Sequence, residues 1–118
     1  MEQYLKALEI VPGLLSARNH LAWVLATCAD GSVRSGARAI EHAEQANRLS
    51  GGKDPGILDT LAAAYAEAGR LDDAVRTAQT ALQSAKGAGS AETAQRIQER
   101  LQLYQAGRPY HEVMRTVP

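Results

Sequence analysis

The sequence predicts an all-α fold built from pairs of packed helices, and three observations lead to that prediction. Apolar residues recur at helical spacing in successive segments of the chain. No segment shows the strict alternation of apolar and polar residues that is typical of a half-buried strand. Two alanine-rich stretches, Leu21–Ala46 and Leu61–Leu82, carry similar patterns of small and large apolar residues. Small residues let two helices approach closely, so the repetition indicates that one packing unit is copied.

Composition limits the kinds of function that this chain can have. Its 118 residues are enough for one small domain, and 45% hydrophobic with 22% charged residues is ordinary for a folded protein. Thirteen basic and thirteen acidic residues cancel without any basic run, so we expect no nucleic-acid partner. No apolar run approaches the ~20 residues that span a bilayer, so we expect no membrane contact by this segment. The compartment stays open, as does membrane anchoring of a parent protein.

Helix signals divide the first half of the chain into three segments. Residues 1–10 have an amphipathic pattern that a proline and a glycine interrupt. Residues 15–28 repeat the pattern and end in the turn residues "ADGS". Ser35 can accept a hydrogen bond from the first amides of a third helix over 36–49, and a Gly-Gly pair permits its left-handed exit.

The second half of the chain has the clearest helix boundaries. Asp54 and the proline after it provide the cap and the first residue of a helix over 55–68, and a glycine ends it. The next helix has its apolar stripe over 71–85, before the loop "KGAGS", and two aspartates in its first turn favour the positive end of the helix dipole. Ser90 is expected to cap a last helix over 90–106.

The segment 55–86 resembles a tetratricopeptide repeat, a helix-turn-helix hairpin of ~34 residues. An upstream segment matches the same pattern, but its first helix lies 40 residues from the later one and its second helix only 35. The turn "TCADGSVRSG" therefore contains an insertion. The matching positions are Leu21, Ala22, Leu25, Ala39, Ala43 and Ala46 upstream, and Leu58, Leu61, Ala62, Tyr65, Gly69, Ala74, Ala78 and Ala81 downstream.

The resemblance implies a right-handed α-solenoid of antiparallel helix pairs with a C-terminal capping helix. The chain is then expected to begin within a repeat unit, as the C-terminal repeat segment of a longer bacterial protein. A polar outer face on the last helix suits a cap, because repeat arrays need polar ends. The single domain 1–118 would comprise the second helix of a truncated repeat (1–12), a repeat with the turn insertion (15–50), a repeat (54–86), the capping helix (90–106) and a tail (107–118).

The family's functional surface is a concave groove, lined by the first helices of successive repeats, that receives an extended peptide or a helix. Trp23 has two open interpretations, as a binding hot spot or as a core residue. Chaperone-binding members grip a terminal carboxylate with basic and amide side chains, and acidic or small residues at most of these positions disfavour that ligand here. The resemblance places Asn19, His20, Trp23, Thr27, Asp59, Ala63, Ala66 and Glu67 at the groove.

No catalytic, metal or cofactor motif is present in the sequence. The histidines His20, His42 and His111 lie on different predicted elements, and HExxH, CxxC, phosphate-loop and GxSxG patterns are missing. Cys28 is the only cysteine, which excludes an internal disulfide. His20 and Cys28 share a helix with Trp23, but a surface imidazole and a half-buried thiol explain them better than a reactive site.

We therefore expect a non-catalytic scaffold for protein–protein interaction, with a protein or peptide partner and no cofactor. One alternative is a structural or oligomerisation spacer that self-associates through an exposed N-terminal helix. Another is an accessory domain of a larger protein, because some similar bacterial repeats are attached to membrane glycosyltransferase-like domains. The sequence does not separate these alternatives.

The alanines are expected to differ in their tolerance of substitution. A large residue at Ala62 or Ala78 is expected to overpack the helix pair and cost about 1–3 kcal/mol. Ala63 and Ala66 are expected to tolerate the same change, because a position that faces a groove leaves space for a larger side chain.

Overall fold

The structure is a computed structural model, and it describes residues 15–112. The helices of this part of the chain confirm the prediction of an all-α fold, and none of them is long and apolar enough to cross a membrane. The helix predicted over 1–10 lies outside the described residues. The helices are α2 (Leu15–Thr27), α3 (Gly36–Leu49), α4 (Pro55–Glu67), α5 (Leu71–Gly87) and α6 (Ala91–Gln105).

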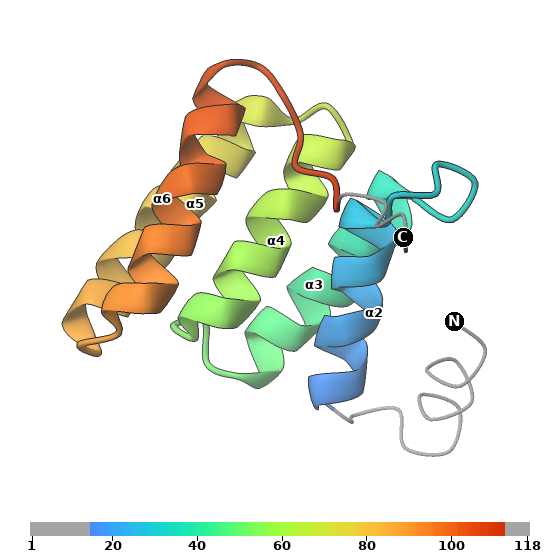
Figure 1. Cartoon of the computed structure of the whole chain (residues 1–118). Helices are drawn as coiled ribbons and strands as arrows, with labels where there is room; N and C mark the ends of the chain where they lie inside the picture. Colours follow the sequence, from blue (N-terminus) through green and yellow to red (C-terminus); the bar gives the residue numbers. More distant parts are fainter. Residues whose placement is uncertain (1–14, 113–118) are drawn as a thin grey trace, which may run out of the picture.

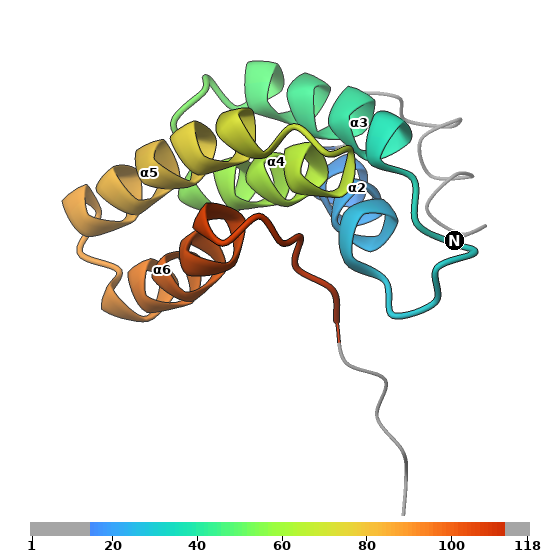
Figure 2. The same cartoon turned by 90° about the horizontal axis from the view of Figure 1, so that it is seen from above.

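The helices pack in the order in which they follow one another along the chain (Figure 1). Each helix contacts the next, and α4 also contacts both α2 and α6. Figure 2 shows that α3 and α5 lie in one layer, while α2, α4 and α6 lie in another. We call the face of α2, α4 and α6 that points away from α3 and α5 the inner face.

The predicted helix ends agree with the structure at most positions. Ser35 accepts a hydrogen bond from an amide of α3, and Asp54 accepts two from the first turn of α4. Ser90 occupies the cap position of α6, but its side chain makes no cap hydrogen bond, so that part of the prediction is wrong. Gly69 follows α4 with a φ of +82°, a left-handed conformation that a residue with a side chain rarely adopts.

Alanine forms much of the core and sets the helix spacing. Ala62 and Ala78, 0% and 1% exposed, lie between α4, α5 and α6, as expected for positions that keep a helix pair close. Ala63 and Ala66 are 1% and 3% exposed, and they belong to the same two core clusters as the other buried alanines. The prediction that these two positions tolerate a large residue is therefore wrong. A large residue at either position would overpack the core, since no open space surrounds it.

Gly36 stands where the start of α3 meets the end of α4. A Cβ at this position would lie 2.6 Å from the backbone nitrogen of Ala68 and 2.7 Å from its Cα. The backbone cannot yield as a flexible side chain would, so Gly36→Ala is expected to lower the free energy of unfolding by about 1–3 kcal/mol in urea. Gly87→Ala is the control, because a Cβ there meets nothing within 4 Å, and it should leave stability unchanged or slightly higher. Equal losses in both variants would contradict the close approach.

Burial and a contact with α2 both favour the neutral form of His42 of α3. Arg18 Nη1 lies 3.2 Å from His42 Nδ1, and a guanidinium can only donate, so Nδ1 must be the acceptor. Burial lowers the pKa of His42, and the charge of Arg18 lowers it further. The folded protein therefore binds fewer protons at this site than the unfolded chain.

This shift predicts a loss of stability in mild acid. The pKa of His42 in the folded protein lies below its ordinary value of 6.5. The stability that neutral His42 contributes is therefore complete above pH 6.5, and it is lost as the pH falls through the pKa of the folded state. The free energy of unfolding of the wild type should therefore fall relative to that of His42→Gln as the pH is lowered from about 7.5 to about 5. Urea unfolding across this range measures it. A difference that does not depend on pH would contradict the assignment.

Candidate functional site

The last described residues cross the inner face of the protein. Residues 106–112, which we call the strap, turn back after α6 and run past α4 to the end of α2 (Figures 1 and 2). Gly107 makes the turn with a φ of +79°. At the far end, the amide of Glu112 donates a hydrogen bond of 2.6 Å to the carbonyl oxygen of Thr27. The sequence predicts only a tail after residue 106, whereas the structure shows that this segment returns to the inner face.

Arg100 of α6 lies beside two aromatic rings at the inner face. Its guanidinium carbon is 5.2 Å from the centre of the Trp23 ring and 5.3 Å from the centre of the Tyr110 ring. The two rings also contact each other, with centres 5.8 Å apart and planes inclined by 36°. One cation therefore interacts with a ring from α2 and with a ring from the strap.

Asp59 of α4 holds Arg100 in this position. Arg100 Nε donates to Asp59 Oδ1 over 2.9 Å, and Nη2 donates to Oδ2 over 2.5 Å. The two side chains are only 14% and 11% exposed, so this bidentate ion pair is largely removed from water. Burial raises the pKa of the Asp59 carboxyl, and the hydrogen bond and charge of Arg100 lower it. The guanidinium is thus the group that favours an ionised Asp59.

Glu112 connects the strap to Trp23. Trp23 Nε1 donates to Glu112 Oε1 over 3.1 Å, and the Tyr110 hydroxyl donates to Oε2 over 3.2 Å. Burial raises the pKa of Tyr110, and the Glu112 carboxylate raises it further, so the hydroxyl keeps its proton and acts as a donor. Trp23 is half-buried, with its ring against the strap and its N–H bonded to it. It is therefore a residue of the inner face and is covered by the strap.

Glu67, the last residue of α4, joins the strap to the loop between α2 and α3. His111 Nε2 donates to Glu67 Oε1 over 2.5 Å, and Arg34 Nε donates to Oε2 over 3.3 Å. Arg34 Nη1 also donates to the carbonyl oxygen of Cys28 over 2.6 Å. Consecutive residues of the strap thus contact α4 through His111 and α2 through Glu112.

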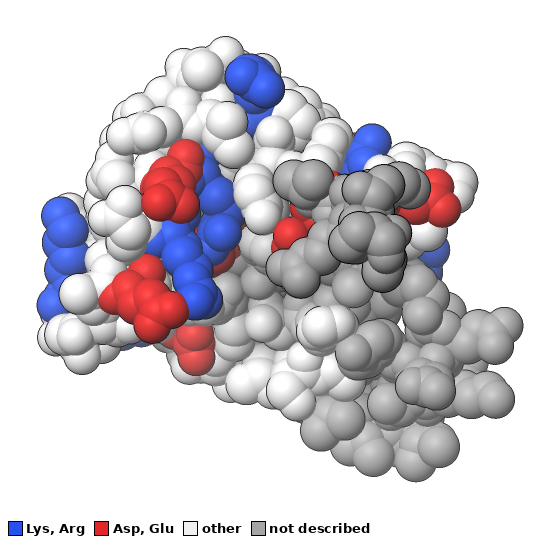
Figure 3. Space-filling model, in the orientation of Figure 1, with Lys and Arg blue, Asp and Glu red and all other residues white. Residues whose placement is uncertain are grey.

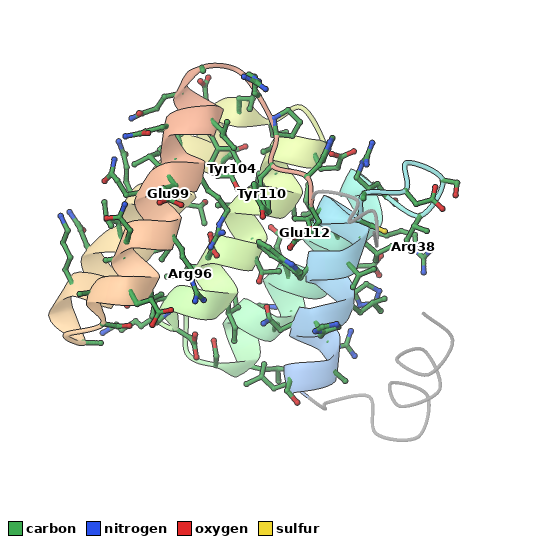
Figure 4. The ribbon with its side chains drawn as sticks, viewed as in Figure 1. Arg38, Arg96, Glu99, Tyr104, Tyr110 and Glu112 are labelled. Carbon is green, nitrogen blue, oxygen red and sulfur yellow. The ribbon has the colours of Figure 1, made fainter. Side chains whose placement is uncertain are left out.

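A hollow of about 350 Å³ remains beside the strap, between α2 and α6. In Figure 4, Tyr110 and Glu112 mark the point where the strap crosses, and Arg96 lies further along α6. Figure 3 shows acidic and basic side chains intermixed over this side of α6. The hollow is lined by Asn19, His20 and Trp23 from α2, by Asp59 and Thr60 from α4, by Arg96 and Arg100 from α6, and by Tyr110 and Glu112 from the strap.

The residues expected at a groove fall into three groups in the structure. Ala63 and Ala66 are buried in the core beneath the inner face, so they do not line the hollow. Thr27 has a buried side chain and contributes its carbonyl oxygen instead. The third group lies at the inner face. Of the predicted residues, Asn19, His20, Trp23 and Asp59 line the hollow, and the side chains of Trp23 and Glu67 contact the strap.

Sequence reasoning missed Arg100 and the three strap residues that bind the face, Tyr110, His111 and Glu112. Arg100 lies on the helix that the sequence predicts to be a cap with a polar outer face, and its partner Asp59 is 41 residues away. The one local signal in the strap is Pro109, which favours extended backbone around it. Nothing in the local pattern indicates which face the extended segment would meet.

No family model matches this chain, and no curated protein or solved structure is detectably similar to it. Residues 15–112 contain no group of three or more His, Cys, Asp or Glu side chains that could hold a metal ion.

Loss of Arg100 is expected to destabilise the protein far more than loss of Arg96, which lies one turn earlier on α6. Arg100→Met would leave the Asp59 carboxylate buried without its partner, and it should lower the free energy of unfolding by about 3 kcal/mol. Arg96 is 62% exposed and pairs with an exposed Glu92, so Arg96→Met should change stability by less than about 0.5 kcal/mol.

Urea unfolding of both variants measures this difference. The double variant Asp59→Leu with Arg100→Met should recover part of the loss, because it leaves no unpaired buried charge. Equal stabilities of the Arg100→Met and Arg96→Met proteins would contradict a structural role for the pair.

Proposed function

We propose that this chain is a non-catalytic protein-interaction module of the tetratricopeptide-repeat type, whose inner face binds an extended peptide. The strap supports this proposal, because it is a segment outside the helices that already lies on the inner face. It is held there by a backbone hydrogen bond to Thr27, by stacking on Trp23 and by contact with Arg100. A partner peptide would use the same kinds of contact.

The arrangement of the helices supports a repeat-type interpretation. The pairs α2/α3 and α4/α5 follow each other in the chain, and the first helix of each pair lies in the inner layer. α6 lies in that layer too, and its Ile97, Leu101 and Tyr104 cover the apolar side of the second pair. In repeat proteins, stacked helix pairs build a solenoid with a concave binding surface, and the proposal extends this arrangement, with a right-handed course, to the present chain. Under this proposal α6 is the capping helix.

Trp23 and Arg100 have the properties of binding hot spots. Both residue types are enriched among the side chains that dominate interface energies. Asp59 fixes the guanidinium through two hydrogen bonds, so Arg100 loses little further freedom when a ligand binds. A tryptophan offers a large contact area at a small cost in side-chain entropy. The inner face is therefore organised before a partner arrives.

Selection of random peptides by the full chain tests the proposal. Selected peptides should shift the amide NMR signals of α2, α4 and α6, and Trp23→Leu should weaken their binding about tenfold or more. Gln79→Ala is the control, because this residue is exposed on α5 in the other layer, and it should leave the affinity unchanged.

Two results would contradict peptide binding at the inner face. One is selection of no peptide at all, and the other is a set of shifted signals confined to α3 and α5. If no peptide is selected and sedimentation shows association that grows with concentration, the structural or oligomerisation spacer would replace the proposal.

A further inference from the structure

The strap provides a chemical description of what the inner face binds. We infer that this face recognises an extended segment in which a tyrosine is followed two residues later by an acidic residue, and that the strap is a built-in competitor which the partner displaces. Tyr110 and Glu112 carry this pattern in the chain itself. The inference rests on the proposed function and adds to it the partner's chemistry and the means of regulation.

The spacing of two residues follows from the contacts of the strap, because two residues with one residue between them both meet α2. Side chains at alternate positions of an extended chain point to the same side, and the residue between them points to the other side. Tyr110 and Glu112 both meet Trp23, one through its ring and the other through the indole N–H. His111, between them, instead reaches Glu67 of α4. The middle position of a partner therefore needs only a hydrogen-bond donor, and the outer two carry the recognition.

The first position requires an aromatic side chain. The ring of Tyr110 lies against Trp23 and within 5.3 Å of the Arg100 guanidinium, and an aliphatic side chain would lose the interaction with that cation. Phenylalanine would keep the stacking, but the hydroxyl of Tyr110 also donates to Glu112. Tyrosine is therefore preferred, because it helps to hold the acidic side chain in place.

The last position requires a hydrogen-bond acceptor for Trp23, and a carboxylate can also accept from the tyrosine two residues before it. Glu112 Oε1 accepts from Trp23 Nε1 and Oε2 accepts from the Tyr110 hydroxyl, so both neighbouring groups are donors. An indole N–H can only donate, and a lysine or arginine at this place would offer it no acceptor. A carboxylate satisfies both donors at once. This requirement excludes basic side chains from the last position of a partner.

The strap is held loosely enough to be displaced. Among residues 106–112, Pro109, Tyr110 and His111 are half-buried and the others are exposed, so the strap adds no fully buried residue to the core. Segments with few buried contacts open at a small cost in free energy while the rest of the fold stays intact. A partner could also enter the hollow beside the strap and contact Asn19 and Arg96, which are not among the strap's contacts described above. These extra contacts would favour the partner over the strap.

Competition by the strap has a measurable size. If the strap covers the face in nine of ten molecules, the apparent affinity for a partner falls about tenfold. The double variant of the full chain, Tyr110→Ala with Glu112→Ala, lacks the two strap side chains that contact Trp23. The single variant Glu112→Ala changes only one residue, which is exposed and lies outside the described helices. Arg108→Ala is the matched control, because Arg108 is an exposed strap residue that follows the turn at Gly107.

The experiment selects peptides from a random library with the double variant and measures their affinity for each full chain. Peptides with tyrosine two residues before Asp or Glu should be enriched, and they should bind the double variant about tenfold more tightly than the wild type or Arg108→Ala. Replacing the tyrosine or the acidic residue of a selected peptide by alanine should weaken binding about tenfold or more. Trp23 is the single tryptophan, so its fluorescence should change when the strap is released, with unchanged far-ultraviolet circular dichroism.

The outcomes separate this inference from the proposed function. Selected peptides that depend on Trp23 but lack the pattern, or that bind the wild type and the double variant equally, would overturn the inference and leave the proposed function standing. Failure to select any peptide with either chain would overturn both. If the double variant loses its helices, Glu112→Ala takes its place, and equal affinity of the peptides for that variant and the wild type would overturn the inference.

Discussion

The ion pair between Asp59 and Arg100 is the interaction on which the inner face depends. The helices α2 and α6 do not pack directly against each other, so the two edges of the face are joined through α4 and through side chains. Asp59 of α4 fixes the guanidinium of Arg100, which then contacts Trp23 of α2 and Tyr110 of the strap. One oriented cation therefore places three helices and the strap relative to one another at a single point.

This pair acts by fixing position more than by adding stability. Removal of two charges from water costs free energy, and a buried ion pair often contributes little net stability compared with apolar residues of similar size. The alanine-rich core clusters bury the apolar surface that stabilises the helix pairs. The bidentate geometry, in contrast, leaves the guanidinium one orientation, and a planar cation in a fixed orientation can bind two aromatic rings. The free energy gained by burial and the geometry of the inner face thus come mainly from different residues of the same helices.

The alanines also explain which residues form the inner face. Small side chains bring neighbouring helices close together, and positions such as Ala63 and Ala66 then become part of the core. The larger and more polar residues of α2, α4 and α6 remain to form the inner face, with Trp23 and Asp59 among them. A close-packed helix layer therefore has its long side chains at the inner face and its small ones between the helices.

The sequence by itself determined the helices of this protein, since apolar periodicity and the caps at Ser35 and Asp54 act within one or two turns. It also indicated Trp23, Asp59 and Glu67 as residues of one surface. Only the tertiary structure decided which other residues of the chain those residues contact. Asp59 and Arg100 are 41 residues apart, and Trp23 and Glu112 are 89 apart. Contacts over such separations leave no local periodic signal, because they form only after the helices have packed and brought the strap to the face.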